Sequence, residues 1–152
     1  MTPDLQELLF GAFPLAYALV QKTPPRPWAT RPADLLYHFP GDGWFDLIFD
    51  MSERLEERLV ALPKGKRFWA VQVKEKWGVF RVYLGGEFGT FASEDSMIVT
   101  EAEARSKRTC EVCGRPGSLR KGRALTDRGP LLPWATLCTE DDEKRHLAAS
   151  MR

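Results

Sequence analysis

The chain has 152 residues, 43% of them hydrophobic and 28% charged, a composition typical of one folded domain with a buried core. Its net charge of +1 argues against a protein whose whole surface binds nucleic acid. The sequence has no run of about 18 apolar residues and no basic start, so it predicts neither a membrane-spanning helix nor a secretory signal. Three cysteines cannot all pair in disulfides, and we therefore expect a reducing, cytoplasmic location.

The first predicted element is a helix of about ten residues. Pro3 suits the first helical position, Asp4 suits the positive helix end, and Pro14 should end the helix. Prolines at residues 23–27 and glycines at residues 41–43 predict two breaks. A long amphipathic helix should follow, because apolar residues then recur at spacings of three and four. They are Trp44, Leu47, Ile48, Met51, Leu55 and Leu59.

Two segments of alternating character, residues 67–73 and 79–84, predict an antiparallel hairpin with a short loop that contains glycine. In the first strand, strict alternation places Val73 on the face opposite Phe68 and Ala70. A two-stranded ribbon is marginal by itself. We therefore expect the hairpin to pack on the amphipathic helix or to gain further strands.

The C-terminal third predicts short elements. Ser93 is a plausible cap for a helix that ends near Arg105, residues 119–120 and 134–137 read as strands, and Thr139 should open a last helix. The predicted fold is a single α+β domain over residues 1–152. Residues 1–100 would pack amphipathic helices on a small antiparallel sheet, and residues 101–152 would form a zinc-ribbon-like subdomain.

Three cysteines suggest a metal site in this subdomain. Cys110 and Cys113 are separated by two residues and followed by a Gly-Arg-Pro-Gly turn, and Cys138 comes 25 residues after Cys113. Thiolates at this spacing are typical of structural zinc, which takes four tetrahedral ligands. For the fourth ligand, Asp141 has the better position, three residues after Cys138. His146 is the alternative. It is chemically the better ligand, but it comes eight residues after Cys138, roughly 12 Å along a helix.

Other interpretations of the cysteines stay open. They are buried thiols without a metal, a catalytic zinc with an open position, and a redox dithiol. The redox interpretation is disfavoured because Cys110 follows a helix and so lacks the helix N-terminus that lowers a thiol pKa. The sequence contains no nucleophile elbow, P-loop, dinucleotide fingerprint or zinc-protease helix. We therefore expect structural Zn²⁺ and no enzymatic activity.

Four motifs resemble a group of small uncharacterised bacterial and phage proteins. The motifs are GDGWFDLI at residues 41–48, VQVKEKWG at 71–78, TCEVCGRPG at 109–117 and TLC at 136–138. The resemblance covers residues 40–141 and implies an α+β fold with a zinc site. In that group a histidine commonly stands three residues after the last cysteine, and this chain has Asp141 there. The departure implies weaker metal binding or a role for His146.

Two surfaces are candidates for partner binding. Trp77, beside Lys74 and Lys76 in the hairpin loop, is an anchor for a protein partner if the indole is exposed, and a core residue if it folds onto the sheet. Residues 105–128 hold eight basic and two acidic residues, a nucleic-acid surface in the alternative interpretation. The residues assigned to that surface are Arg108, Arg115, Arg120, Lys121 and Arg123. The preferred hypothesis is a zinc-stabilised protein that recognises a protein partner, such as a toxin-neutralising, phage-accessory or host-modulating inhibitor.

Overall fold

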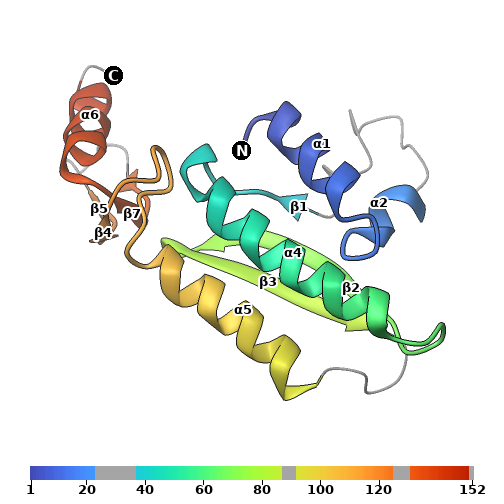
Figure 1. Cartoon of the computed structure of the whole chain (residues 1–152). Coiled ribbons are helices and arrows are strands. Elements are labelled where there is room, and N and C mark those ends of the chain that lie inside the picture. The colour runs from blue at the N-terminus through green and yellow to red at the C-terminus, as the bar shows by residue number, and fades with distance from the viewer. Residues whose placement is uncertain (23–36, 87–91, 125–130, 151–152) are drawn as a thin grey trace.

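The computed structural model describes residues 1–22, 37–86, 92–124 and 131–150. The predicted break at residues 23–27 lies outside these ranges. The fold is α+β, as predicted: helices pack on a small sheet, and a separate C-terminal unit sits at one end of that sheet (Figure 1). None of the described helices has both the length and the apolar character that crossing a bilayer requires.

The sheet is mixed, with strand order β1-β2-β3. β2 (Phe68–Lys76) and β3 (Val79–Gly86) form the predicted antiparallel hairpin. β1 (Tyr37–His38) pairs with β2 in parallel, so the prediction of a purely antiparallel sheet was wrong. A two-residue strand is too short to show a periodic pattern in the sequence. Tertiary contacts hold it instead, including a 2.7 Å hydrogen bond from the Tyr37 hydroxyl to the Ala70 carbonyl.

A β-bulge corrects the predicted faces of β2. The register with β3 shifts between Ala70 and Gln72, which leaves Val71 as the extra residue. Because one residue is inserted, Val73 turns to the same buried side as Phe68 and Ala70. The prediction that Val73 faces away from them was therefore wrong. The bulge lets β2 bury an additional apolar side chain.

The long helix α4 (Phe45–Ala61) follows the short 3-10 helix η1 (Asp42–Trp44) and lies across the sheet (Figure 1). All six residues of its predicted apolar stripe are buried, which confirms that prediction. Its polar face is joined to α5 (Ser93–Ser106) by ion pairs, including Arg58 Nε to Asp95 Oδ1 at 3.0 Å. Ser93 is the first helical residue rather than the cap, since the N-cap position is Ala92. The Ala92 N–H donates to Asp95 Oδ2.

The N-terminal helices complete the main core. α1 (Pro3–Ala12) ends two residues before Pro14, as predicted, and α2 (Ala18–Lys22) follows. Phe10 and Tyr17 pack edge-on with ring centroids 5.3 Å apart, and both rings contact Tyr37 of β1. These aromatic contacts place the short parallel strand beneath the first helices.

The C-terminal unit consists of short elements. β4 (Ser118–Arg120) pairs antiparallel with β7 (Ala135–Leu137), and β5 (Arg123–Ala124) pairs with β6 (Leu131–Leu132). α6 (Thr139–Ser150) ends the described chain, which confirms the predicted last helix. The unit has its own small buried cluster, separate from the main core. The cluster contains Cys110, Ala135, Leu137 and Cys138.

Candidate metal centre

The backbone of the Cys110–Cys113 turn is fixed by hydrogen bonds within the turn. The Gly114 N–H donates to the Cys110 carbonyl at 2.9 Å, and the Cys110 N–H donates to the Arg115 carbonyl at 2.8 Å. Gly114 has φ 74°, a left-handed conformation that glycine adopts without strain. These bonds hold the two cysteines on a closed turn directly after α5.

Cys138 and Asp141 come from the junction of β7 and α6. Cys138 precedes α6, and Asp141 lies in its first turn, so a spacing of three residues brings the two side chains together. The Asp141 N–H also lies 3.5 Å from Cys138 Sγ, as a donor to sulfur. The strand-to-helix junction therefore positions the second half of the site.

Four potential ligand atoms lie within 4.8 Å of one another. They belong to Cys110, Cys113, Cys138 and Asp141. Cys113 Sγ and Cys138 Sγ are 3.7 Å apart, and Asp141 Oδ2 is 3.2 Å from the Sγ atoms of Cys110 and Cys138. A tetrahedral ion with Zn–S of about 2.3 Å and Zn–O of about 2.0 Å separates its ligands by about 3.5–3.8 Å. The cluster has the composition and nearly the spacing of a four-ligand metal site.

His146, the alternative fourth ligand, is not in this cluster. Its Nε2 lies 3.6 Å from Asp142 Oδ1, one turn back along α6. His146 comes eight positions after Cys138, about two helical turns, and this separation moves the ring away from the thiols. Position along the helix therefore decides between the two candidates, and it places Asp141 with the cysteines.

The protonation of the free site follows from burial and hydrogen bonding. Burial raises the pKa of Cys110 to about 11, so this thiol is protonated until a metal displaces the proton. Hydrogen bonds from Cys113, Cys138 and Cys110 lower the pKa of Asp141 to about 2. The carboxylate is therefore ionised and ready to coordinate a cation.

Arg115 forms part of the surroundings of the cluster. Its Nε donates to Cys113 Sγ at 3.3 Å, and its Nη2 donates to Glu140 Oε2 at 2.7 Å. The Asp141 carboxylate raises the pKa of Cys113 while the Arg115 guanidinium lowers it, and the net effect is a lowered pKa. Sequence reasoning assigned Arg115 to a phosphate-binding surface. The structure instead points it at Cys113, a candidate metal ligand, where a guanidinium would offset thiolate charge.

The GDGW motif packs against this turn, a role that sequence reasoning missed. The Gly43 N–H donates to the Glu111 carbonyl at 2.9 Å, and Trp44 Nε1 donates to the Thr109 carbonyl at 2.6 Å. A Cβ atom on Gly41 would lie 2.2 Å from the Glu111 oxygen, and one on Gly43 would lie 2.4 Å from the Cys110 oxygen. The two glycines thus allow two backbones to touch. Two glycines within the three residues before a tryptophan were the available signal.

Glu111, between the two cysteines of the turn, lies where the C-terminal unit meets the main core. Its N–H donates to the Thr136 carbonyl at 2.9 Å. Burial, and secondarily the neighbouring charge of Glu75, raise the pKa of Glu111 to about 7. A substantial fraction of Glu111 is therefore protonated near neutral pH, which reduces the cost of burying this carboxyl group.

The hairpin tip joins the C-terminal unit at a second point. Trp77 and Gly78 form a two-residue turn with φ values of 58° and 73°. The Thr136 hydroxyl donates to the Gly78 carbonyl at 2.6 Å. Trp77 is 64% exposed, and its ring meets that of Trp134 edge-on, with centroids 6.3 Å apart. It is thus exposed and contacts Trp134, a residue that sequence reasoning had not connected with the tip.

The lysines near the tip differ in orientation. Lys74 Nζ donates to Gln72 Oε1 at 2.7 Å and lies 5.1 Å from the centre of the Tyr83 ring, so it is directed along the sheet. Lys76 is exposed next to Trp77. Of the two predicted lysine partners of Trp77, only Lys76 is free of these contacts.

Two of the five predicted nucleic-acid residues lie next to acidic side chains. Arg115 pairs with Glu140, and Arg120 Nε lies 3.6 Å from Asp142 Oδ2. Arg108 and Lys121 are exposed and form no ion pair with any residue that the structure describes. The backbone of Arg123 lies in β5, and its side chain is outside the described part.

No family model, curated protein sequence or solved structure matches this chain. The resemblance of residues 40–141 to bacterial and phage proteins therefore stays a prediction.

The choice of Asp141 predicts the behaviour of two variants. Loss of a residue that only hydrogen-bonds to a metal ligand weakens metal binding by roughly 10–100-fold. We expect Asp141→Ala to weaken it by more, because this substitution removes a ligand itself. His146→Ala should leave the affinity unchanged. Competitive titration with Zn²⁺ and with Co²⁺, whose absorption reports thiolate coordination, measures both. Equal affinities for the two variants would contradict the assignment.

Proposed function

We propose that this protein is a non-enzymatic binding protein whose C-terminal unit is held by structural zinc and which recognises a protein partner through its hairpin tip. Three thiolates and one carboxylate favour zinc over the harder cations, which prefer oxygen ligands. Four protein ligands leave no open position for substrate. A closed site of this kind stabilises a fold and performs no chemistry itself.

The observation that carries the proposed recognition role is the conformation of Trp77. A bulky residue with φ 58° is an outlier, since glycine or asparagine suits the left-handed region far better. The strained residue nevertheless exposes an indole that is 64% accessible. Strain of this kind concentrates at functional sites, and tryptophan is enriched among the residues that dominate binding energy at protein interfaces.

The tip surface, defined as Trp77, Trp134, Leu119 and Lys76, extends from the hairpin to the C-terminal unit. Leu119 on β4 is 41% exposed, and its Cδ1 would lie 2.5 Å from a Cβ on Gly78. Trp134 directly precedes β7, the strand that leads to Cys138. Zinc bound by Cys138 would therefore also hold Trp134 against Trp77, which links the metal to recognition.

The test of this proposal is a comparison of affinity-tagged variants in extracts of the native host. Trp77→Asn removes the indole and suits the left-handed turn, so it should fold at least as well as wild type. Met97→Asn is the control, because Met97 is 67% exposed on α5, away from the tip. We expect wild type and the Met97→Asn variant to retain one partner protein from the extract. The Trp77→Asn variant, and wild type treated with a metal chelator, should not retain it.

With the purified partner, Trp77→Asn should weaken binding by about 2 kcal/mol, roughly 30-fold, as expected for a central aromatic anchor. Isothermal calorimetry measures this difference. If no protein in the extract depends on Trp77 for its retention, the proposed recognition role is wrong.

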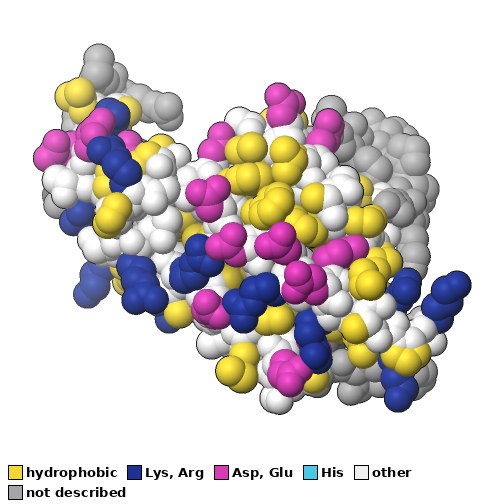
Figure 2. All heavy atoms as spheres, viewed as in Figure 1, with side chains coloured by type: hydrophobic (Ala, Val, Ile, Leu, Met, Phe, Trp, Pro, Cys, Tyr) yellow, Lys and Arg dark blue, Asp and Glu magenta, His cyan; other side chains and the backbone are white. Residues whose placement is uncertain are grey.

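A second candidate function is nucleic-acid binding. Figure 2 shows Lys and Arg side chains gathered along the lower side of the C-terminal unit. Lys107, Arg108 and Lys121 are exposed and form no ion pair among the described residues. Retention on DNA and RNA that falls steeply with salt would support this function. Weak retention without salt dependence would exclude it.

A further inference from the structure

β3 lies at one end of the strand order β1-β2-β3, and no strand in the described part of the chain pairs with its outer side. Exposed edge strands present rows of unused backbone donors and acceptors. In β3, one backbone donor shows which residues direct their backbone N–H and C=O groups away from β2.

That donor is the N–H of Phe80, which donates to Ser106 Oγ on α5 at 3.0 Å and therefore points away from β2. Because outward groups recur at every second residue of a strand, the backbone groups of Val82 and Leu84 point the same way. Val82 and Leu84 make no outward backbone hydrogen bond to any residue that the structure describes. Two alternate residues of β3, Val82 and Leu84, thus have outward backbone groups without a partner among the described residues.

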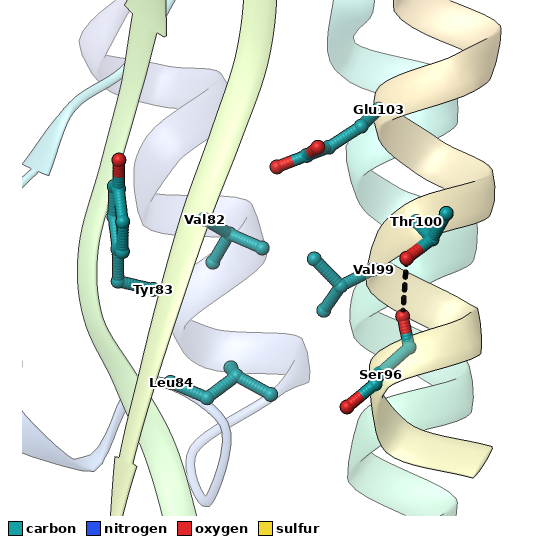
Figure 3. A pocket seen from close by; sticks show the side chains of 7 residues that line it. All are labelled: Val82, Tyr83, Leu84, Ser96, Val99, Thr100 and Glu103. Atoms are coloured by element: carbon teal, nitrogen blue, oxygen red, sulfur yellow. Dashed lines mark hydrogen bonds between the residues drawn. The ribbon is translucent and has the colours of Figure 1, made fainter. Parts of the chain in front are cut away.

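A groove lies along this part of the edge, between β3 and α5 (Figure 3). Its volume is about 310 Å³, and Val82, Leu84 and Val99 form its apolar part. Figure 3 shows Val82 and Leu84 directed toward α5 and Tyr83 directed to the other side. Since all three residues line the groove, it borders the strand edge and is not confined to one face of the sheet.

We propose that this groove binds an extended peptide segment of another protein, which adds a strand to the outer edge of β3. The backbone groups of Val82 and Leu84 would form the pairing hydrogen bonds. Alternate side chains of the peptide would enter the space between β3 and α5. Recognition by an exposed edge strand beside a pocket for alternate side chains is an established mode of peptide binding.

The charge of the lining residues specifies the peptide further. Glu103 is the charged residue among them, and the polar remainder is Tyr83, Ser96 and Thr100. The Glu103 carboxylate binds Arg81 on β3 and is 21% exposed, so its accessible part can accept a second donor. The groove therefore suits a peptide with apolar residues at alternate positions and a lysine or arginine next to Glu103.

A second copy of this chain fits the edge poorly. Two paired strands lie about 4.8 Å apart, whereas two packed helices need 8–10 Å between their axes. α5 runs alongside β3, so pairing two β3 edges would also bring two α5 helices together (Figure 1). A lone strand has no such helix and can enter.

This proposal is independent of the tip surface and is tested with peptides. A library of random dodecapeptides would be selected on the purified 152-residue chain, and the enriched peptides measured by fluorescence anisotropy. Thr100→Trp and Ser96→Trp each place an indole in the groove at exposed helix positions, and Met97→Trp is the matched control on the same helix. We expect at least tenfold weaker binding to both groove variants and unchanged binding to the control.

Two further readouts distinguish strand addition from other binding. N-methylation of the peptide amides that face β3 should abolish binding, because it removes the donors that pair with the strand. N-methylation of the other amides should have little effect. Hydrogen exchange at Val82 and Leu84 should slow when the peptide is added. Enriched peptides that bind the groove variants as well as wild type would overturn the proposal. So would slow exchange at Val82 and Leu84 that depends on protein concentration without peptide, because it would indicate self-pairing.

Discussion

Removal of the proposed zinc is expected to unfold the C-terminal unit while α4 and the β2–β3 hairpin stay folded. The unit buries only a small cluster around Cys110 and Cys138, and its strands are two or three residues long. So small an apolar core does not offset the chain entropy of folding, and units of this size usually depend on a metal or disulfides. The binding free energy of a structural zinc then becomes folding free energy.

The expected loss of stability of the C-terminal unit is about 5 kcal/mol or more, since structural zinc in small units contributes on this order. Chelation of wild type and the variant Cys138→Ser should have the same effect. Hydrogen exchange resolved by residue, with and without chelator, would show loss of protection in β4, β7 and α6. His146→Ala is the control and should melt like wild type. Indistinguishable exchange in metal-loaded and chelated protein would contradict the structural role.

Gly43→Ala is expected to destabilise the protein by about 3 kcal/mol or more, a large effect for one methyl group. The added Cβ would lie 2.4 Å from the Cys110 oxygen, 2.4 Å from the Gly114 nitrogen and 2.6 Å from the Cys113 nitrogen. All three are backbone atoms of the Cys110–Gly114 turn, so no flexible side chain can move aside. The substitution should separate the GDGW segment from the turn and break the Gly43–Glu111 hydrogen bond.

The matched control is Gly11→Ala. Gly11 lies within α1, and a Cβ there would meet no atom within 4 Å. Alanine should stabilise this helix by roughly 0.5–1 kcal/mol, because glycine loses more backbone entropy on folding. Denaturant unfolding of both variants measures the difference. A Gly43→Ala variant as stable as wild type would show that the two backbones do not pack as closely as described.

Local sequence patterns determined much of the fold and of the metal centre. The buried stripe of α4 follows from spacings of three and four residues, and the hairpin follows from alternation around a glycine-containing turn. The two halves of the metal centre were equally visible, because a two-residue gap between cysteines and a three-residue step on a helix place ligands together locally. The choice of Asp141 over His146 depended on the same helical geometry.

Other features required the tertiary structure, because they depend on contacts between residues far apart in the chain. The parallel pairing of β1, the bulge at Val71, and the docking of Gly43 on the cysteine turn have no local period. The sequence also left two possibilities for Trp77, exposed or folded onto the sheet, and only the tertiary structure, in which Trp77 is exposed, decided between them. Side-chain periodicity reports which face of an element is buried, whereas the identity of the neighbour depends on how distant segments pack.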